Sequence, residues 1–145
     1  MFEFNLDEHE IKNVHFIGIG GISMSGIASL LLEKGYNVSG SDRSLSDIVS
    51  GLKKDGATIY IGQSKDNIKN PDLVVYTDAI LDDNVELIAA RNLGIPVVSR
   101  GIFLGALMRN YKHSIAVSGS HGKSTATSMI SKILLNSKED ATILL

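Results

Sequence analysis

Short apolar runs alternate with longer amphipathic stretches along this chain, and turn residues separate them. The apolar runs predict buried strands at residues 14–17, 36–42, 57–62, 72–77 and 95–99. After the first run, Met24, Ile27 and Leu31 recur at the spacing of one helix face. Strands that alternate with helices are typical of a parallel sheet. The pattern therefore predicts an α/β fold, with a doubly wound, mainly parallel sheet and helices on both faces.

Polar residues with capping side chains predict where the later helices begin. Ser44 is expected to cap the second helix. Either Asp82 or Asp83 is expected to cap the third helix, over residues 84–93. A further helix is expected over residues 102–110, after the fifth strand.

The same pattern begins again after residues 109–113. A predicted strand at residues 114–118 leads into a second glycine-containing loop, a helix, and a last predicted strand at residues 141–145. The helix carries apolar residues on one face: Ala126, Met129, Ile130, Ile133 and Leu134. We expect one complete unit over residues 1–111 and the opening of a second over residues 112–145.

The second loop has the composition of a phosphate-binding loop, with the sequence GSHGKST. Glycines let backbone N–H groups converge on phosphate oxygens, and the N-terminus of the following helix adds a favourable dipole. Lys123 can reach the terminal phosphates of a nucleotide, and the hydroxyl of Ser124 is well placed for Mg²⁺. The strict pattern requires glycine where Val117 stands, and the alternative is a plain turn with an exposed lysine.

The first loop, GIGGISMSG, follows the first predicted strand and is close to a dinucleotide-binding pattern. Gly18 and Gly20 fit that pattern, and Asp42 lies about 20 residues on, where a carboxylate binds ribose hydroxyls. Ser23 does not fit, because it occupies the position of the third glycine. The loop predicts a site for a nicotinamide cofactor or for another diphosphate, and tight packing of strand against helix is the alternative.

Two loops of this kind on successive units bear on the choice between functions. A hydride-transfer enzyme needs one diphosphate site. A ligase that joins a nucleotide-linked substrate to a second molecule using ATP needs two. The sequence therefore favours an ATP-dependent ligase over an NAD(P)-binding oxidoreductase, and a noncatalytic nucleotide-binding module is a third alternative.

Composition and charge exclude several other classes of protein. The chain has 145 residues, a formal net charge of −2 and scattered basic residues, whereas nucleic-acid and anionic membrane surfaces need clustered Lys and Arg. Cysteine is absent, which excludes disulfides, thiolate metal sites and cysteine catalysis. The N-terminal sequence lacks the pattern of a secretion signal, and no apolar run reaches the roughly 20 residues that cross a bilayer. We expect a cytoplasmic protein without nucleic-acid or membrane partners.

Two longer segments contain these loops: VHFIGIGGISMSGIASLLLEKGYNVSGSD and, further along, IAVSGSHGKSTATSMI. Both resemble the N-terminal part of a known family, the UDP-N-acetylmuramate–L-alanine ligases, and the similarity covers nearly the whole chain. The resemblance implies a Rossmann-like first domain that holds UDP, a central domain that binds ATP, and a C-terminal domain for the amino acid. The resemblance also implies the reaction of this family, in which the muramoyl carboxylate is converted to an acyl phosphate and the amine of L-alanine attacks that acyl phosphate.

The resemblance implies a role for each loop. The first loop would hold the diphosphate of UDP-N-acetylmuramate, Asp42 would lie near the uridine, and Arg100 matches an arginine of the family. The implied substrate-binding residues are Gly18, Gly20, Gly21, Ser23, Met24, Ser25, Asp42, Thr77, Asp78, Ala79 and Arg100. In the second loop, the implied catalytic residues are Lys123, Ser124 and Thr125. Lys123 would neutralise the ATP phosphates, and Ser124 and Thr125 would help to hold Mg²⁺. The implied ATP-binding residues are Gly119, Ser120, His121, Gly122, Lys123, Ser124 and Thr125.

Four positions depart from the family pattern. Ser23, Gln63, Asp78 and Ile102 stand where the family usually has Gly, His, Ser and Glu. Asp78 matters most, because a carboxylate that faced the diphosphate would oppose its charge unless the side chain turned away. A sister ligase for a related UDP-muramoyl substrate is therefore an alternative.

The second unit is expected to be incomplete. On the family pattern the chain would lack most of the ATP domain and all of the amino-acid domain. We expect it to bind the UDP substrate without completing the ligation. The apolar face of the last helix is expected to be covered by a second copy of the chain, as a homodimer, or by folding back on the first unit.

Overall fold

The computed structural model describes residues 1–8 and 10–144. The chain divides into two compact units, residues 1–111 and residues 112–145. Leu145, the last residue of the strand predicted at residues 141–145, lies outside the described residues.

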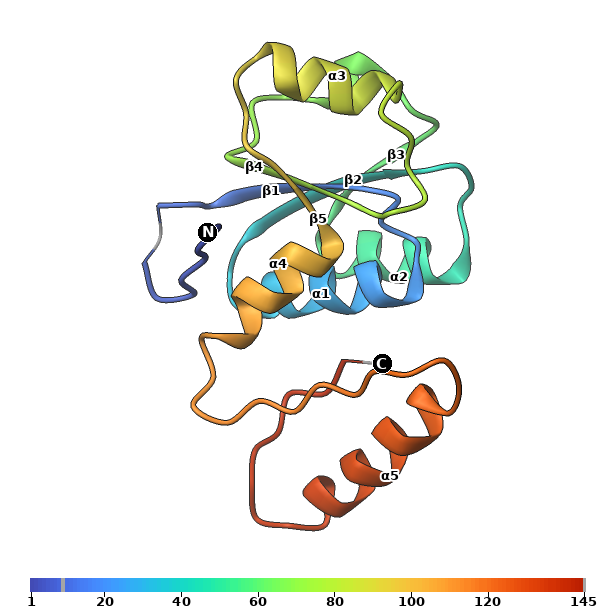
Figure 1. Cartoon of the computed structure of the whole chain (residues 1–145). Coiled ribbons are helices and arrows are strands. Elements are labelled where there is room, and N and C mark those ends of the chain that lie inside the picture. Colours follow the sequence, from blue (N-terminus) through green and yellow to red (C-terminus); the bar gives the residue numbers. More distant parts are fainter. Residues whose placement is uncertain (9, 145) are drawn as a thin grey trace. The chain divides into compact units, whose positions relative to one another are not determined.

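The first unit is built on a five-stranded sheet in which every neighbouring pair of strands is parallel. The order across the sheet is β3-β2-β1-β4-β5 (Figure 1). The strands are β1 (Asn13–Ile17), β2 (Asn37–Asp42), β3 (Thr58–Ile61), β4 (Leu73–Tyr76) and β5 (Val97–Ser99). Each strand predicted within the first unit is present, and the doubly wound parallel α/β fold is confirmed.

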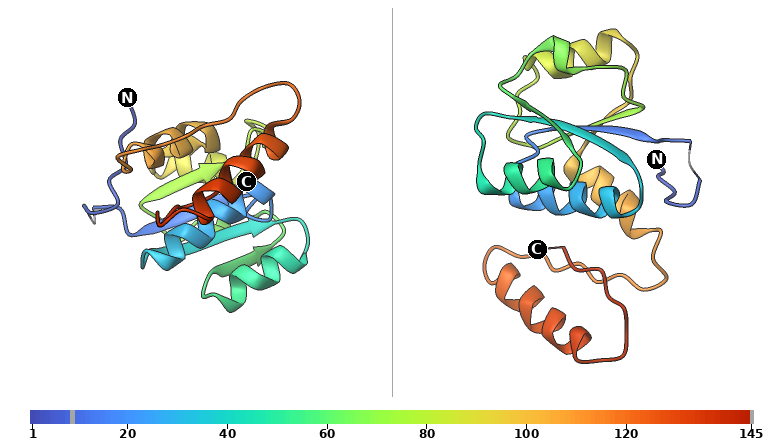
Figure 2. Two further views of the ribbon diagram at one scale, coloured as in Figure 1. Left: turned by 90° about the horizontal axis from the view of Figure 1, so that it is seen from below. Right: turned by 180° about the vertical axis from the view of Figure 1, so that it is seen from behind.

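Helices cover both faces of this sheet (Figure 2). One face carries α1 (Ile22–Glu33), α2 (Asp47–Lys54) and α4 (Arg100–Met108), and the other carries α3 (Val85–Asn92) and the short 3-10 helix η1 (Lys65–Asn67). Among the described residues, no helix combines the length and the apolar character that crossing a membrane requires.

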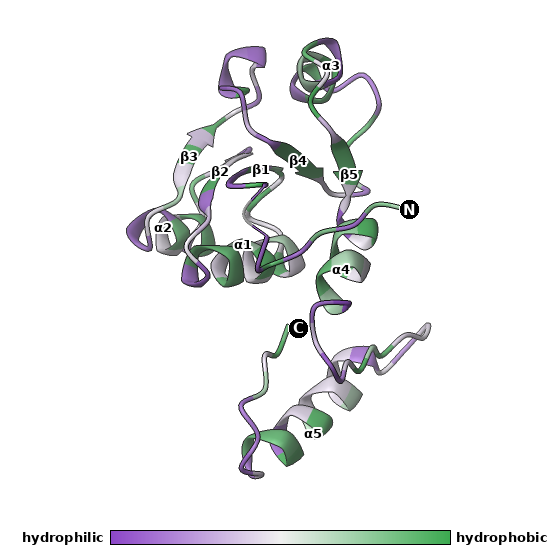
Figure 3. Ribbon diagram, turned by 90° about the vertical axis from the view of Figure 1, so that its left-hand side faces the viewer, coloured by the Kyte–Doolittle hydropathy of each residue, from purple (hydrophilic) through white to green (hydrophobic). Residues whose placement is uncertain are grey.

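Apolar side chains fill both interfaces between the sheet and its helices. On the side of α1, α2 and α4, Phe16, Met24 and Phe103 are almost completely buried. The rings of Phe16 and Phe103 meet edge to face, with centroids 6.4 Å apart. The α3 side has its own buried cluster, which consists of Ile17, Ile68, Val74, Leu87 and Ala90. Apolar residues run along β4 and β5 (Figure 3), because strands covered on both faces need apolar side chains in both directions.

The cap of α2 differs from the sequence prediction. Ser46 caps this helix, and its hydroxyl accepts from the backbone N–H of Val49 at 3.2 Å. The prediction of Ser44 was wrong, because the chain enters the helix two residues later. A capping side chain must belong to the residue directly before the first helical turn, where it reaches the free N–H groups.

The cap of α3 also differs from the prediction. Asn84 caps this helix, and its side-chain oxygen accepts from the backbone N–H groups of Glu86 and the residue after it. The prediction of Asp82 or Asp83 was wrong. Asp82 instead forms an ion pair with Arg91, with 3.0 Å between Oδ1 and Nη2.

The second unit contains one helix, α5 (Lys123–Leu135), and no strand among its described residues. The strands predicted at residues 114–118 and 141–145 are therefore absent over residues 114–118 and 141–144. A parallel strand is stable when neighbouring strands pair with its backbone N–H and C=O groups. The described part of this unit offers no such neighbour, and Met129 and Ile133 of α5 are exposed.

A buried polar network lies on the α3 side of the sheet. Glu86, in the first turn of α3, is completely buried. Its Oε2 accepts from the hydroxyl of Ser41 at 2.7 Å and lies 3.2 Å from Nε2 of His15, whose other ring nitrogen contacts Ser39. Its Oε1 accepts from the side-chain amide of Asn67. Burial alone raises the pKa of the Glu86 carboxyl, but the hydrogen bonds from His15, Ser41 and Asn67 hold that pKa below its ordinary value of 4.5.

The lowered pKa of Glu86 predicts a loss of stability in acid. A depressed pKa in the folded state contributes stability that is present above pH 4.5 and is lost as the pH falls through the folded pKa. Urea unfolding followed by circular dichroism should therefore give a steeper fall in the free energy of unfolding below pH 4.5 for the native chain than for Glu86→Gln. Parallel curves for the two proteins would contradict this prediction.

Candidate functional site

The strand order creates a topological switch point between β1 and β4. The chain leaves β1 toward α1 on one face of the sheet and leaves β4 toward α3 on the other (Figure 2). Ligands of open α/β sheets bind at the carboxyl ends of the strands at such a point. Here the loops after the two strands approach closely, since a Cβ on Gly18 would lie 2.9 Å from Cγ2 of Thr77. Gly18 also has a φ of +83°, a conformation that favours glycine.

The end of β2 holds the first glycine loop in place. The backbone carbonyl oxygen of Ser41 accepts from the N–H of Gly18 at 2.9 Å and from that of Ile19 at 3.0 Å. The carboxylate of the next residue, Asp42, accepts from the N–H of Gly20 at 2.8 Å. A Cβ on Gly20 would lie 2.7 Å from the same carboxylate oxygen. A side chain at this position would therefore displace the carboxylate of Asp42 from its hydrogen bond to the loop.

The helices that follow the two glycine loops lack a side-chain cap. Ser46, Asn84 and Ser99 cap α2, α3 and α4 with their side chains. α1 and α5 instead begin after Gly21 and Gly122, without a capping hydrogen bond from a side chain. The first N–H groups of a helix have no acceptor within the helix, and anions bind to them readily. Among the described helices of eight or more residues, this difference singles out α1 and α5 as the ones open to an anion.

The first turn of α1 offers backbone N–H groups rather than side chains. Ser25 donates its N–H to the carbonyl of Gly21 at 2.8 Å, so the N–H groups of Ile22, Ser23 and Met24 precede the helical ladder. The side chain of Met24 is buried in the core, and the hydroxyl of Ser25 donates to the carbonyl of Ile22 at 2.9 Å. Of the three predicted residues in this turn, Ser23 is the one whose hydroxyl contacts another predicted site residue.

Arg100, the first residue of α4, brings predicted site residues together. Its Nη1 donates to the hydroxyl of Ser23 at 3.3 Å, and its Nη2 lies 3.6 Å from Oδ2 of Asp78. Asp78 and Ala79 lie in an exposed turn after β4. The side chain of Asp78 is 69% exposed, so solvent screens this ion pair and its contribution to stability is roughly 0–1 kcal/mol. An anionic ligand could replace the carboxylate at small cost.

Asp42 has a structural role beside the predicted one. Its Oδ2 accepts from the N–H of Gly20, and its Oδ1 accepts from the N–H of Arg43, both at 2.8 Å. The carboxylate expected near the uridine thus also holds the glycine loop. The contact of Asp42 with uridine stays a prediction.

Two residues near the site were missed by the sequence reasoning. Ser41 is completely buried and holds the loop through its backbone carbonyl, which no side-chain pattern reveals. The one sequence signal for Ser41 is that a polar residue, the second serine after Ser39, stands in a strand expected to be buried. Glu86 carried only the signal of a carboxylate in the first turn of a helix, which is usually a partner of the helix dipole.

The second glycine loop directly precedes α5. Gly122 adopts a left-handed conformation with a φ of +75°, and its carbonyl accepts from the N–H of Ala126 at 2.9 Å. The ammonium group of Lys123 donates to the carbonyl of Gly119 at 2.7 Å. The side chain of Lys123 thus lies against its own loop. The other predicted residues of this loop are exposed to solvent: Ser120, His121, Ser124 and Thr125.

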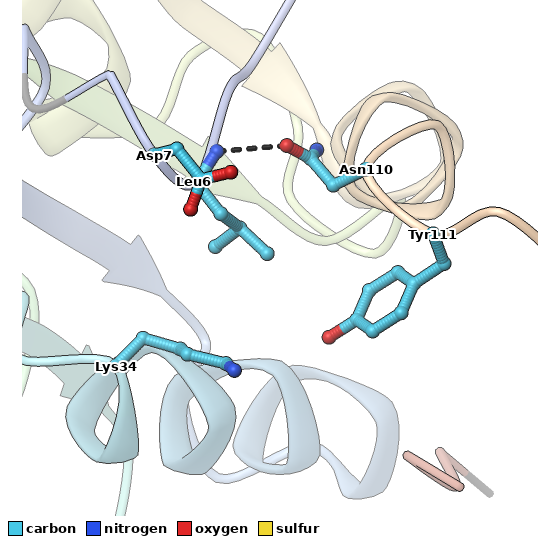
Figure 4. Close-up of a pocket in the computed structure, with 5 residues that line it drawn as sticks. All are labelled: Leu6, Asp7, Lys34, Asn110 and Tyr111. Carbon is cyan, nitrogen blue, oxygen red and sulfur yellow. Dashed lines mark hydrogen bonds between the residues drawn. The ribbon is translucent and has the colours of Figure 1, made fainter.

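A pocket of about 340 Å³ lies elsewhere in the first unit. It is lined by Leu6, Asp7, Lys34, Asn110 and Tyr111 (Figure 4). Lys34 is the C-cap of α1, so the pocket is at the opposite end of this helix from the glycine loop. Its lining includes none of the predicted site residues, and it is not the predicted substrate site.

Comparisons with known proteins identify the family. The catalytic domain of the Mur ligase family matches residues 13–112. A UDP-N-acetylmuramate–L-alanine ligase of Alkaliphilus metalliredigens is 54% identical over 144 residues, which are 99% of this chain and 31% of that protein. The crystal structure of the UDP-N-acetylmuramate-alanine ligase MurC from Thermotoga maritima has a TM-score of 0.78 and 39% identity, over 85% of this chain and 29% of its own. A murein peptide ligase from Psychrobacter arcticus has a TM-score of 0.76 and 33% identity, over 84% of this chain and 26% of its own.

The matched region contains the whole sheet and the first glycine loop. The chain spans 31% of the length of the relative from Alkaliphilus metalliredigens. These relatives are ligases, and the alternative of a nicotinamide-dependent oxidoreductase is therefore not retained. With its sheet, its first glycine loop and 100 consecutive residues matched, the chain belongs to the Mur ligase family.

Proposed function

We propose that this chain is the N-terminal part of a cytoplasmic ligase that joins L-alanine to UDP-N-acetylmuramate with ATP. Residues 1–111 would bind the UDP part of the substrate, and residues 112–145 would open the ATP-binding domain. The observation that carries this proposal is the pair of helices, α1 and α5, that begin after glycine loops without a side-chain cap. Two such N-termini suit two phosphate-bearing ligands.

In the first unit, the diphosphate would lie at the N-terminus of α1. The N–H groups of Ile22, Ser23 and Met24 would bind it, and the guanidinium of Arg100 would neutralise its charge. Asp42 would lie near the uridine, and Thr77 with its turn would line the cleft. These roles rest on the approach of the loops after β1 and β4 at the switch point.

In the second unit, the ATP phosphates would lie at the N-terminus of α5. Lys123 would neutralise them, and Ser124 and Thr125 would offer hydroxyls to Mg²⁺. No cluster of three or more His, Cys, Asp or Glu residues in the described part of the chain could hold a metal ion. Mg²⁺ would be held chiefly through ATP, with the hydroxyl of Ser124 as its main ligand from this chain and that of Thr125 in support, and would help to neutralise the transferred phosphoryl group.

A murein peptide ligase is the second candidate, since the structure from Psychrobacter arcticus has a TM-score of 0.76. The higher identity to the alanine ligases, 54% for the relative from Alkaliphilus metalliredigens, favours L-alanine as the co-substrate. We further propose that the exposed apolar residues Met129 and Ile133 of α5 are covered in the working enzyme by the remaining ATP domain or by a second copy of the chain.

The proposed UDP site predicts a thermal shift. UDP or UDP-N-acetylmuramate at about 100 times its Kd should stabilise the folded state by about 2.7 kcal/mol and raise Tm visibly, because it binds only the folded chain. NAD should give no shift. Arg100→Met should reduce the shift, whereas Arg91→Met, a matched change outside the site, should not. A shift with NAD and none with the uridine nucleotides would overturn the proposal.

The proposed contact between Arg100 and the diphosphate predicts a gain of affinity on removal of Asp78. Its ion pair with Arg100 is exposed and 3.6 Å long, so it adds little to positioning, while its negative charge opposes the ligand. Asp78→Asn should lower the Kd for UDP about two- to fivefold in isothermal titration calorimetry, as expected for an exposed ion pair. The matched control is Asp82→Asn, which removes another exposed carboxylate from an ion pair with arginine and should leave the Kd unchanged. Weaker binding by Asp78→Asn would contradict this account.

The proposed division of labour also predicts that the 145-residue chain is inactive by itself. Phosphoryl transfer depends on the positioning and neutralisation of charge by a complete site. A coupled phosphate-release assay with ATP, UDP-N-acetylmuramate and L-alanine should give no signal above that of Lys123→Ala. Phosphate release that depends on L-alanine would show that the chain completes the reaction unaided.

A further inference from the structure

Glu86 is a buried titratable group that the proposed function does not use, and it contacts a second one, His15. It lies in the first turn of α3, has no solvent exposure, and accepts hydrogen bonds through both carboxylate oxygens. A buried carboxylate costs free energy unless it is fully hydrogen-bonded, and a network of this kind fixes the geometry of the groups around it.

One oxygen of Glu86 leads to the first glycine loop through a single residue. The hydroxyl of Ser41 donates to Oε2 at 2.7 Å. The backbone carbonyl of Ser41 accepts the N–H groups of Gly18 and Ile19, at 2.9 Å and 3.0 Å. The side chain of Ser41 is thus held from the α3 side while its main chain holds the loop. A change in the position of Ser41 would move both loop hydrogen bonds together.

The other oxygen of Glu86 leads to the connection between β3 and β4. Oε1 accepts from the backbone N–H of Ser64 at 3.3 Å and from the side-chain amide of Asn67. Beside them, Asn84 donates to the side chain of Gln63 in the same connection. One carboxylate therefore joins α3 to two segments at the carboxyl edge of the sheet, where the diphosphate is proposed to bind.

We propose that Glu86 is a positioning residue for the glycine loop: through Ser41 it sets the backbone at Gly18 and Ile19, and so the start of α1. This inference rests on the proposed function only for the identity of the ligand. The ordering of the loop is a property of the chain without ligand.

The strand β2 offers a matched pair of variants for the test. Ser41 and Ser39 both hydrogen-bond into the network from the same strand. Ser41 connects Glu86 to the glycine loop, whereas Ser39 contacts His15 at 2.8 Å, away from that loop. Ser41→Ala and Ser39→Ala therefore remove the same atom at two places, although Ser41 is fully buried and Ser39 is partly buried. A purely structural role of the network predicts that each variant accelerates exchange at Gly18, Ile19 and Phe16 by the same factor.

The experiment is amide hydrogen exchange by NMR on the whole 145-residue chain, with the N–H of Phe16 in β1 as an internal reference. In Ser41→Ala, exchange at Gly18 and Ile19 should accelerate about tenfold relative to Phe16, and the Kd for UDP should rise about tenfold, as expected on loss of a hydrogen bond to a charged group. Ser39→Ala should leave both within about twofold. Glu86→Gln weakens the hydrogen bond between the hydroxyl of Ser41 and residue 86, and it should selectively accelerate exchange at the same two amides, Gly18 and Ile19.

The possible results separate the two proposals. Equal acceleration at all three amides, or equal effects of the two serine variants, would overturn the positioning role. Selective acceleration in Ser41→Ala, in a chain that does not bind UDP before mutation, would support the positioning role and overturn the proposed ligand. Binding of UDP by the native chain without selective acceleration in Ser41→Ala would overturn the positioning role alone.

Discussion

The arrangement of the site depends on the hydrogen bonds that the end of β2 makes to the loop after β1. Three successive N–H groups of that loop donate hydrogen bonds to the end of β2. Those of Gly18 and Ile19 donate to the carbonyl of Ser41, and that of Gly20 donates to the carboxylate of Asp42. Parallel pairing places Ile17, the last residue of β1, opposite Ser41. The loop therefore turns where β2 presents its acceptors, and α1 begins from a fixed position at the switch point.

The two glycine loops share one physical feature, the free N-terminus of the helix that follows. A side-chain cap contributes about 0.5–2 kcal/mol to a helix, and α2, α3 and α4 have one whereas α1 and α5 do not. A side-chain cap at Gly21 or Gly122 would occupy N–H groups that are proposed to bind an anion. Without such a cap, these N–H groups remain open to phosphate oxygens.

The two faces of the sheet stabilise the first unit in different ways. The face of α1, α2 and α4 is apolar and includes the aromatic contact of Phe16 with Phe103. The α3 face combines an apolar cluster with the hydrogen-bonded carboxylate of Glu86. Apolar packing is tolerant of small shifts, whereas a buried hydrogen bond is directional. The α3 face, which contains the directional hydrogen bonds of Glu86, is the face connected to Ser41 and through it to the glycine loop.

The sequence by itself determined the strands of the first unit, the parallel fold and both glycine loops, because apolar periodicity and glycine spacing are local properties. It misplaced the caps of α2 and α3, since several capping residues stand close together there. It also predicted strands at residues 114–118 and 141–145, but a strand needs partners that local sequence does not supply. Only the tertiary structure decided the contact of Arg100 with Ser23 and Asp78 and the bond of Glu86 to Ser41. Those contacts join residues that are distant in the chain, and the order of the strands and the packing of α1, α3 and α4 on the sheet bring them together.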